Sequence, residues 1–89
     1  MYYVYILGCV RDRKIVSYYT GYTNNLDRRV HEHEKNARDH NRKKYTGRFE
    51  DVVLLWNRTF KTKKEAMDEE KRIKKLGSAS KKRLIQSQE

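Results

Sequence analysis

Long apolar runs separated by short polar segments dominate the first part of the chain, and this pattern predicts strands. Residues 2–10 (YYVYILGCV) are almost continuously apolar or aromatic, which is typical of a strand that is central or covered on both faces. Residues 11–14 (RDRK) separate this run from a second expected strand at about residues 15–20, so the two should form an antiparallel hairpin. A third strand is expected over residues 51–60 (DVVLLWNRTF).

The apolar spacing changes to a helical period in two stretches. Gly21 is expected to let the chain leave the second strand, and any of residues 23–25 (Thr, Asn, Asn) can cap the helix that follows. Leu26 and Val30 form the apolar stripe of this first helix. Residues 62–76 (TKKEAMDEEKRIKKL) predict a second amphipathic helix.

The second helical stretch has start and stop signals of its own. Thr62, with Glu65 three residues later, fits a capping box. Gly77 is expected to end the helix, and Ser78 to cap a last short helix at about residues 80–85 that buries its final leucine and isoleucine.

These elements follow one another as strand, strand, helix, strand, helix, helix (ββαβαα). A single small sheet with helices packed on it predicts an α+β domain with a three-stranded antiparallel sheet. No repeat and no Pro-rich or Gly/Ser-rich linker divides the chain, so residues 1–89 are expected to form one domain.

Charge narrows the class of partner. The 89 residues contain 22 Lys and Arg against 12 Asp and Glu, a net charge of +10, which favours a polyanion, most often nucleic acid. The one cysteine, Cys9, is expected to be a buried thiol of a reducing compartment. With no apolar segment long enough for a membrane span and no signal-peptide pattern, we expect a cytoplasmic protein, with nucleoid association as an option and no membrane partner.

Residues 35–48 (KNARDHNRKKYTGR) are polar, basic and without periodicity, so they are expected to form a surface loop. Lys43, Lys44 and Arg48, with Tyr45 between them, are typical of a groove that follows a nucleic-acid backbone. The alternative is a plain solvated loop.

One arginine of the first helix is expected to face inward. Arg29 follows Leu26 by three positions and His33 follows Val30 by three, so both polar residues lie on the apolar side, whereas Arg28 lies roughly opposite. A guanidinium turned inward needs an anion, because burying it unpaired is expensive. The anion is either an internal carboxylate or a phosphate.

A carboxylate occupies the equivalent position in the second helix. Glu70 falls among Ala66 and Ile73 on the apolar face, and Glu69 lies near its border, so periodicity alone does not separate the two. Such a carboxylate is out of place unless it is paired or bound to a metal. It therefore forms a salt bridge to Arg29 or ligates a hard cation beside that arginine.

Short motifs in fixed order give the chain a resemblance to a known family. Tyr3-Val4-Tyr5, Tyr19-Thr20-Gly21, Asp27-Arg28-Arg29 and His33 resemble the GIY-YIG nuclease superfamily, and the match continues through residues 44–46 (KYT), 65–76 and 81–85 (KKRLI). The chain is similar to the small single-domain branch, related to excision-nuclease subunit and structure-specific endonuclease domains. Two positions depart from the motif: Tyr3 replaces its first glycine, and Thr20 is the middle residue of the second triplet.

The resemblance implies a sheet flanked by helices and metal-dependent hydrolysis of a phosphodiester. It implies that Tyr5 and Tyr19 orient or deprotonate the attacking water, with Tyr5 as the base, and that Arg29 stabilises charge on the scissile phosphate. His33 would assist proton transfer or hold phosphate, and Glu70 would bind one divalent ion, Mg²⁺ or Mn²⁺. The residues assigned to nucleic-acid contact are Gly21, Arg28, Lys43, Lys44, Tyr45 and Arg48.

The leading hypothesis is a metal-dependent endonuclease acting on DNA in repair, recombination or restriction. The alternatives are a non-catalytic nucleic-acid-binding module that kept the fold, and a structural basic protein. The sequence points to no particular protein partner.

Overall fold

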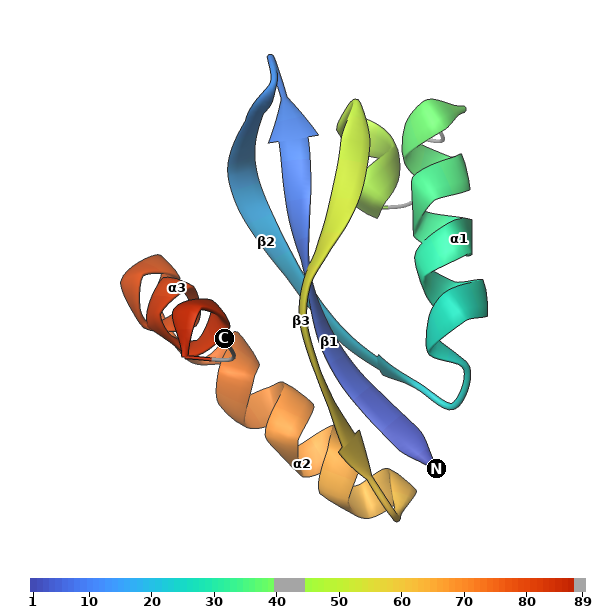
Figure 1. The fold of residues 1–89 in the computed structure, drawn as a ribbon, viewed down its shortest axis with the longest axis vertical. Coiled ribbons are helices and arrows are strands. Elements are labelled where there is room, and N and C mark those ends of the chain that lie inside the picture. Colours follow the sequence, from blue (N-terminus) through green and yellow to red (C-terminus); the bar gives the residue numbers. More distant parts are fainter. Residues whose placement is uncertain (40–44, 88–89) are drawn as a thin grey trace.

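The computed structural model describes residues 1–39 and 45–87 and shows an α+β fold (Figure 1). The expected order of strands and helices is confirmed, with one additional short 3₁₀ helix, η1. In chain order the elements are β1 (Tyr2–Arg11), β2 (Lys14–Thr23), α1 (Leu26–Arg38), η1 (Tyr45–Arg48), β3 (Asp51–Phe60), α2 (Lys63–Lys74) and α3 (Ser78–Gln86).

The strand β1 is the centre of the sheet, as its apolar run predicts. Both neighbours pair with it antiparallel, giving the order β2-β1-β3. Helix α1 and η1 lie on one face of the sheet, and α2 and α3 lie on the other (Figure 1). Because successive side chains of a strand point to opposite faces, β1 must be apolar at every position to contribute to both layers.

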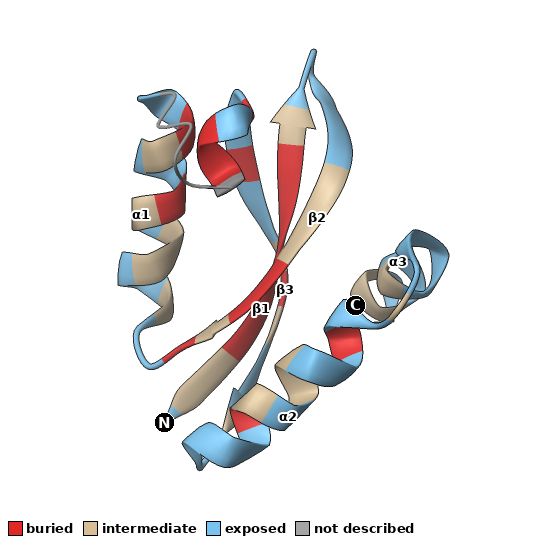
Figure 2. Ribbon diagram, turned by 180° about the vertical axis from the view of Figure 1, so that it is seen from behind, coloured by how far each residue is buried: buried red, intermediate tan, exposed pale blue. Residues whose placement is uncertain are grey.

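The two layers have separate cores, which meet at β1. Tyr5, Leu7 and Cys9 pack on the α1 side with Ala37, Phe49 and Val52, while Val4 and Ile6 pack on the α2 side with Trp56, Ala66 and Ile73. The buried positions run along β1 and along the inner sides of α1 and α2 (Figure 2). Cys9 is a free, buried cysteine, as expected.

The position of Gly21 corrects one prediction. The strand β2 continues through Thr23, so Gly21 lies inside it, opposite Tyr5, and does not adopt positive φ. A Cβ at this position would lie 2.5 Å from the Tyr5 hydroxyl oxygen. Gly21 therefore makes room for the Tyr5 ring instead of turning the chain.

The tight turn of the fold is at the β1–β2 hairpin. Asp12 and Arg13 both have positive φ (53° and 64°), the conformation of a two-residue type I′ turn. This turn matches the twist of the paired strands, which is why two non-glycine residues are held in it.

The start of α1 agrees with its prediction, whereas the end of α1 and the start of α3 differ from theirs. Asn25 is the N-cap of α1, and its side chain accepts from the Arg28 backbone N–H at 3.1 Å. Helix α1 continues to Arg38, beyond the expected end, because Ala37 is buried against the core of the α1 side. Helix α3 is capped by Gly77 without a side-chain bond, so Ser78 is its first residue and not its cap.

The start of α2 is close to its prediction. Thr62 is the N-cap, accepting from the Glu65 backbone N–H at 3.2 Å and donating its hydroxyl to the Glu65 carboxylate at 2.9 Å. No helix within residues 1–39 and 45–87 is long and apolar enough to span a membrane.

Candidate active site

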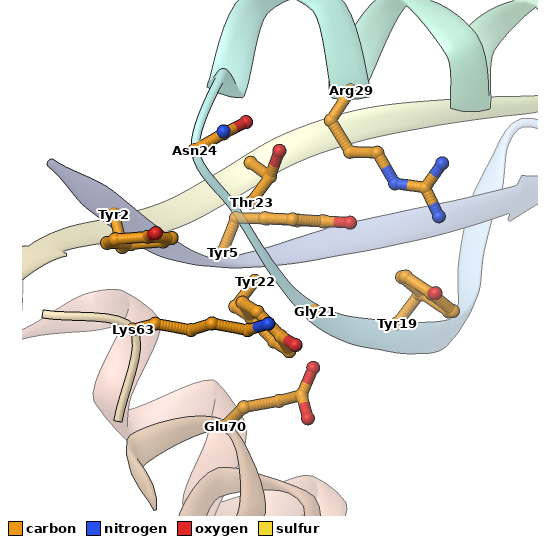
Figure 3. A pocket seen from close by; sticks show the side chains of 10 residues that line it. All are labelled: Tyr2, Tyr5, Tyr19, Gly21, Tyr22, Thr23, Asn24, Arg29, Lys63 and Glu70. Carbon is orange, nitrogen blue, oxygen red and sulfur yellow. The ribbon is translucent and has the colours of Figure 1, made fainter. Parts of the chain in front are cut away.

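A pocket of about 490 Å³ lies at the edge strand β2, and side chains from both faces of the sheet line it (Figure 3). Tyr5 and Tyr19 reach it from the α1 side and Tyr22 from the α2 side. Its lining is Tyr2, Tyr5, Tyr19, Gly21, Tyr22, Thr23, Asn24, Arg29, Lys63 and Glu70. Four of the five residues predicted to be catalytic are thus brought together, and His33 does not line the pocket.

Arg29 enters the pocket from the first turns of α1, on the same side of β2 as Tyr5 (Figure 3). Its Nη1 atom pairs with Glu32 Oε2 at 2.8 Å, and its side chain remains 39% exposed. The partner of Arg29 in the described structure is therefore a carboxylate of its own helix, and the expected alternative of a salt bridge to Glu70 is not found. Arg28 also reaches Glu32, at 3.6 Å, but does not line the pocket.

The structure separates the two glutamates that periodicity left equivalent. Glu70 points into the pocket from α2, on the opposite side of β2 from Arg29, and its Oε1 lies 3.6 Å from Lys74 Nζ (Figure 3). Glu69 points elsewhere and forms ion pairs with Arg58 and Arg72, which hold the pKa of its carboxyl below the usual range, Arg72 by a hydrogen bond above all. Glu70 is the carboxylate that faces Arg29 across the pocket.

Behind Tyr5 lies a buried chain of hydrogen-bonding side chains. The Tyr5 hydroxyl is 3.0 Å from His33 Nε2, and His33 Nδ1 is 3.1 Å from Thr46 Oγ1. All three side chains are buried, and the imidazole also lies against Tyr19, with 4.8 Å between ring centroids. His33 is therefore placed to exchange a proton with Tyr5, whereas the expected alternative of direct phosphate contact does not fit its position.

Burial sets the protonation states of this chain. Desolvation, with a smaller contribution from Tyr19, raises the pKa of Tyr5 to about 12, although a hydrogen bond and positive charge from Arg29 oppose the shift. Desolvation and the Arg29 charge lower the pKa of His33 to about 4. At neutral pH both groups are uncharged. Because Arg29 only donates, this state is satisfied when the Tyr5 hydroxyl donates to Nε2 and Nδ1–H donates to Thr46.

Sequence reasoning missed six residues of this site, among them Thr23 and Asn24, which it named only as possible helix caps. Tyr2, Tyr22 and Lys63 line the pocket, and Thr46 completes the buried chain. Two of them carried a signal, because Tyr22 follows Gly21 directly and Thr46 belongs to the KYT triplet.

The predicted contacts of the basic segment have varied outcomes. Lys43, Lys44 and the side chain of Tyr45 lie outside the described residues. Arg48 is exposed and does not line the pocket, and its backbone carbonyl accepts from Arg11 Nη2 at 2.9 Å.

The pocket offers one carboxylate to a metal ion. In the part of the chain that the structure describes, no three His, Cys, Asp or Glu side chains form a metal-binding group. A lone carboxylate is compatible with Mg²⁺, which keeps several waters and takes substrate phosphate oxygens as further ligands. Glu70, aimed into an open pocket opposite a guanidinium, fits an ion that protein and substrate hold jointly.

Comparison with known proteins supports the same conclusion. The family model described as the GIY-YIG catalytic domain matches residues 1–83. This chain belongs to the GIY-YIG family. This is a family of nucleases. Three motif residues of β1 and β2 meet at the pocket: Tyr5 lies opposite Gly21, and the ring centroids of Tyr5 and Tyr19 are 6.3 Å apart.

Relatives of similar length carry the same fold. The UPF0213 protein of Oceanobacillus iheyensis is 47% identical over 98% of this chain and 92% of its own length, and that of Halobacterium salinarum is 43% identical over 96% and 100%. The solution NMR structure of the UPF0213 protein from Bacillus halodurans is 36% identical, covers 96% of this chain and 82% of that chain, and has a TM-score of 0.56. These relatives make the α+β GIY-YIG fold secure, while a single domain over residues 1–89 stays a prediction.

The lowered pKa of His33 predicts a stability change with pH. The folded protein holds His33 neutral down to about pH 4, whereas the unfolded chain binds a proton near pH 6.5, so stability is complete above pH 6.5 and falls as the pH drops toward 4. The contribution lost by pH 4 is about 3 kcal/mol. Denaturant unfolding of wild type and His33→Gln between pH 7.5 and 4 measures it. The free energy of unfolding should depend less on pH in His33→Gln than in wild type. His31→Gln changes an exposed position of the same helix and should keep the wild-type pH dependence. An equal pH dependence in all three proteins would contradict this account.

Proposed function

We propose that this protein is a divalent-metal-dependent endonuclease that hydrolyses phosphodiester bonds in DNA. The observation that carries the proposal is the pocket around β2, where a guanidinium, two tyrosine hydroxyls and a single carboxylate converge from two faces of one sheet. The net charge of +10 supports a polyanionic substrate. We further propose that the protein acts in the cytoplasm, on nucleoid DNA, in repair, recombination or restriction.

Arg29 is placed to stabilise the charge that develops during hydrolysis. A phosphodiester transition state carries negative charge on its non-bridging oxygens, and a guanidinium fixed in advance stabilises that charge without reorganisation. Arg29 is held by Glu32 and also hydrogen-bonds Tyr5, and the remaining donors of its planar group would be available to a phosphate in the partly exposed pocket.

Glu70 would hold the metal ion. When bound, Mg²⁺ or Mn²⁺ supplies positive charge to the phosphate oxygens on the side opposite Arg29. Glu70 carries out this role with its carboxylate oriented by α2, and Lys74 one turn later pairs with it in the ligand-free protein.

Tyr5 and His33 together would remove the proton of the attacking water. A free phenolate is disfavoured by a pKa of about 12, but Tyr5 can pass its own proton to His33 Nε2 as it accepts one from water. Desolvation lowers the pKa of His33 most, and the Arg29 charge lowers it further. A phosphate bound to Arg29 would neutralise this second contribution and make the imidazole a better proton acceptor in the complex. Thr46 would hold the imidazole in the orientation and tautomer that this transfer needs.

The raised pKa of Tyr5 also favours one alternative. A tyrosine buried at a pKa of about 12 is a poor base on its own, and a module that binds nucleic acid without cutting would need no base at all. This non-catalytic function keeps the basic surface and treats the Tyr5–His33–Thr46 chain as structural.

Cleavage of a labelled panel decides between the two functions. Single-stranded, duplex and branched DNA, with RNA of the same sequences, are incubated with the protein in Mg²⁺, in Mn²⁺ and in excess chelator. The nuclease is expected to cut at least one DNA member and to stop when the metal is removed. Binding without cutting on every member would establish the non-catalytic module, and metal-independent cutting would overturn the role of the ion.

A further inference from the structure

Lys63 forms a second positively charged wall of the pocket. It is the first residue of α2 and lines the pocket with Tyr2, Tyr22 and Asn24, none of which belongs to the motif constellation (Figure 3). Among the described residues, the Lys63 side chain is exposed and makes no ion pair or hydrogen bond, whereas Lys74 of the same helix pairs with Glu70. The pocket thus contains one lysine whose charge is not neutralised by the protein.

The position of Lys63 in its helix is electrostatically unfavourable without a ligand. The N-terminus of a helix carries partial positive charge, so anions are favoured there and lysines are not. Lys63 and Lys64 both occupy this first turn, against one acid, Glu65, whose carboxylate is bonded to Thr62. A phosphate at this end of α2 would be stabilised by the helix amides and by the ammonium group together.

The pocket already has a place for the scissile phosphate, between Arg29 and the ion expected at Glu70. Arg29 and that ion together would already supply positive charge to the scissile phosphate, which leaves the Lys63 ammonium available to a second phosphate of the strand. Lys63 and Tyr22 lie with Glu70 across β2 from Arg29, and the Lys63 ammonium points toward Tyr22 (Figure 3). A strand that continues from the scissile position along this side of β2 would meet them next.

We propose that Lys63 binds the phosphate next to the scissile one and so fixes the register of the DNA strand in the pocket. This inference rests on the proposed nuclease function and adds a substrate-binding residue to it. Tyr22 and Tyr2 flank the same part of the pocket and offer hydroxyl groups or ring faces to the sugar and base between the two phosphates.

The test compares Lys63→Ala with Lys64→Ala, which removes the same charge from the same helix end but outside the pocket lining. For an oligonucleotide from the panel that is cut, Lys63→Ala should raise KM about tenfold, change kcat less than about twofold and reduce the salt dependence of binding by about one counterion. Lys63→Arg should restore most of the affinity, and Lys64→Ala should stay within about twofold of wild type in KM.

Neutral methylphosphonate linkages placed one at a time along the oligonucleotide identify the phosphate. A methylphosphonate at the linkage next to the scissile one should raise the KM of wild type by the factor seen for Lys63→Ala. It should not raise the KM of Lys63→Ala further. Equal KM values for Lys63→Ala and Lys64→Ala would overturn the inference, and so would additive effects of Lys63→Ala and the methylphosphonate on KM. In either case cleavage by the wild type would leave the nuclease function intact. A wild type that cuts nothing would overturn the nuclease function, and the assignment of Lys63 with it.

Discussion

Glu70→Ala is expected to abolish metal-dependent cleavage, lowering kcat by at least about 10³-fold while the protein stays folded. Glu70 is the only carboxylate that lines the pocket in the described structure, so its loss leaves an incoming ion with no charged protein oxygen to hold it. The fold should tolerate the change, because the 3.6 Å contact with Lys74 is an i,i+4 pair of the kind worth about 0.5 kcal/mol or less. Single-turnover cleavage and thermal unfolding measure the two effects.

Glu69→Ala is the matched control for this prediction. It removes the adjacent carboxylate of the same helix, together with its pairs to Arg58 and Arg72, and it lies outside the pocket. It should therefore destabilise the fold more than Glu70→Ala does and cleave at nearly the wild-type rate. Loss of cleavage in both variants, or in neither, would show that the carboxylate at position 70 does not hold the ion.

Arg29→Ala is expected to lower kcat by about 10³-fold with a smaller effect on DNA affinity. In the proposed reaction its guanidinium would face the scissile phosphate on the side opposite Glu70, and stabilisation present only in the transition state appears in kcat. Arg29→Lys should restore little, because an ammonium group cannot reproduce the planar fork that contacts two oxygens while Glu32 holds the other edge.

Arg28→Ala separates this role from general electrostatics. Both arginines pair with Glu32 in the same helix, so the two substitutions make similar changes to net charge and to helix stability. Arg28 points away from the pocket, and its loss should weaken binding modestly and leave kcat near wild type. Kinetics at saturating DNA make the comparison. An Arg29→Ala protein that loses affinity but keeps a kcat equal to that of Arg28→Ala and of wild type would mean that Arg29 contributes only attraction for the nucleic acid.

The contact between Tyr5 and His33 makes a raised pKa at Tyr5 compatible with the proposed catalysis. In the proposed reaction the Tyr5 hydroxyl would meet the attacking water and His33 Nε2 would receive the proton. These two atoms are 3.0 Å apart, and both side chains are buried. In such a site the proton moves along a preformed hydrogen bond, so no free phenolate has to accumulate.

Local patterns in the sequence determined the elements and their order. The continuous apolar run of β1 required cover on two faces, and the helical spacing of Leu26, Arg29, Val30 and His33 turned that arginine and that histidine inward. Both inferences needed only the geometry of a single strand or helix, and both agree with the structure. The excess of lysine and arginine also predicts a polyanionic partner without any knowledge of the fold.

The arrangement of the site depended on tertiary structure. Periodicity gives the direction of a side chain relative to its own helix axis, so it could not distinguish Glu69 from Glu70 until α2 was packed on the sheet. Gly21 is needed because a side chain there would clash with Tyr5 of the neighbouring strand. The local sequence does not show which residue of β1 pairs with Gly21. Lys63 and Thr46 come from other elements than the two motif strands, and they became part of the site only because the sheet edge and the α1–η1 contact brought them to it.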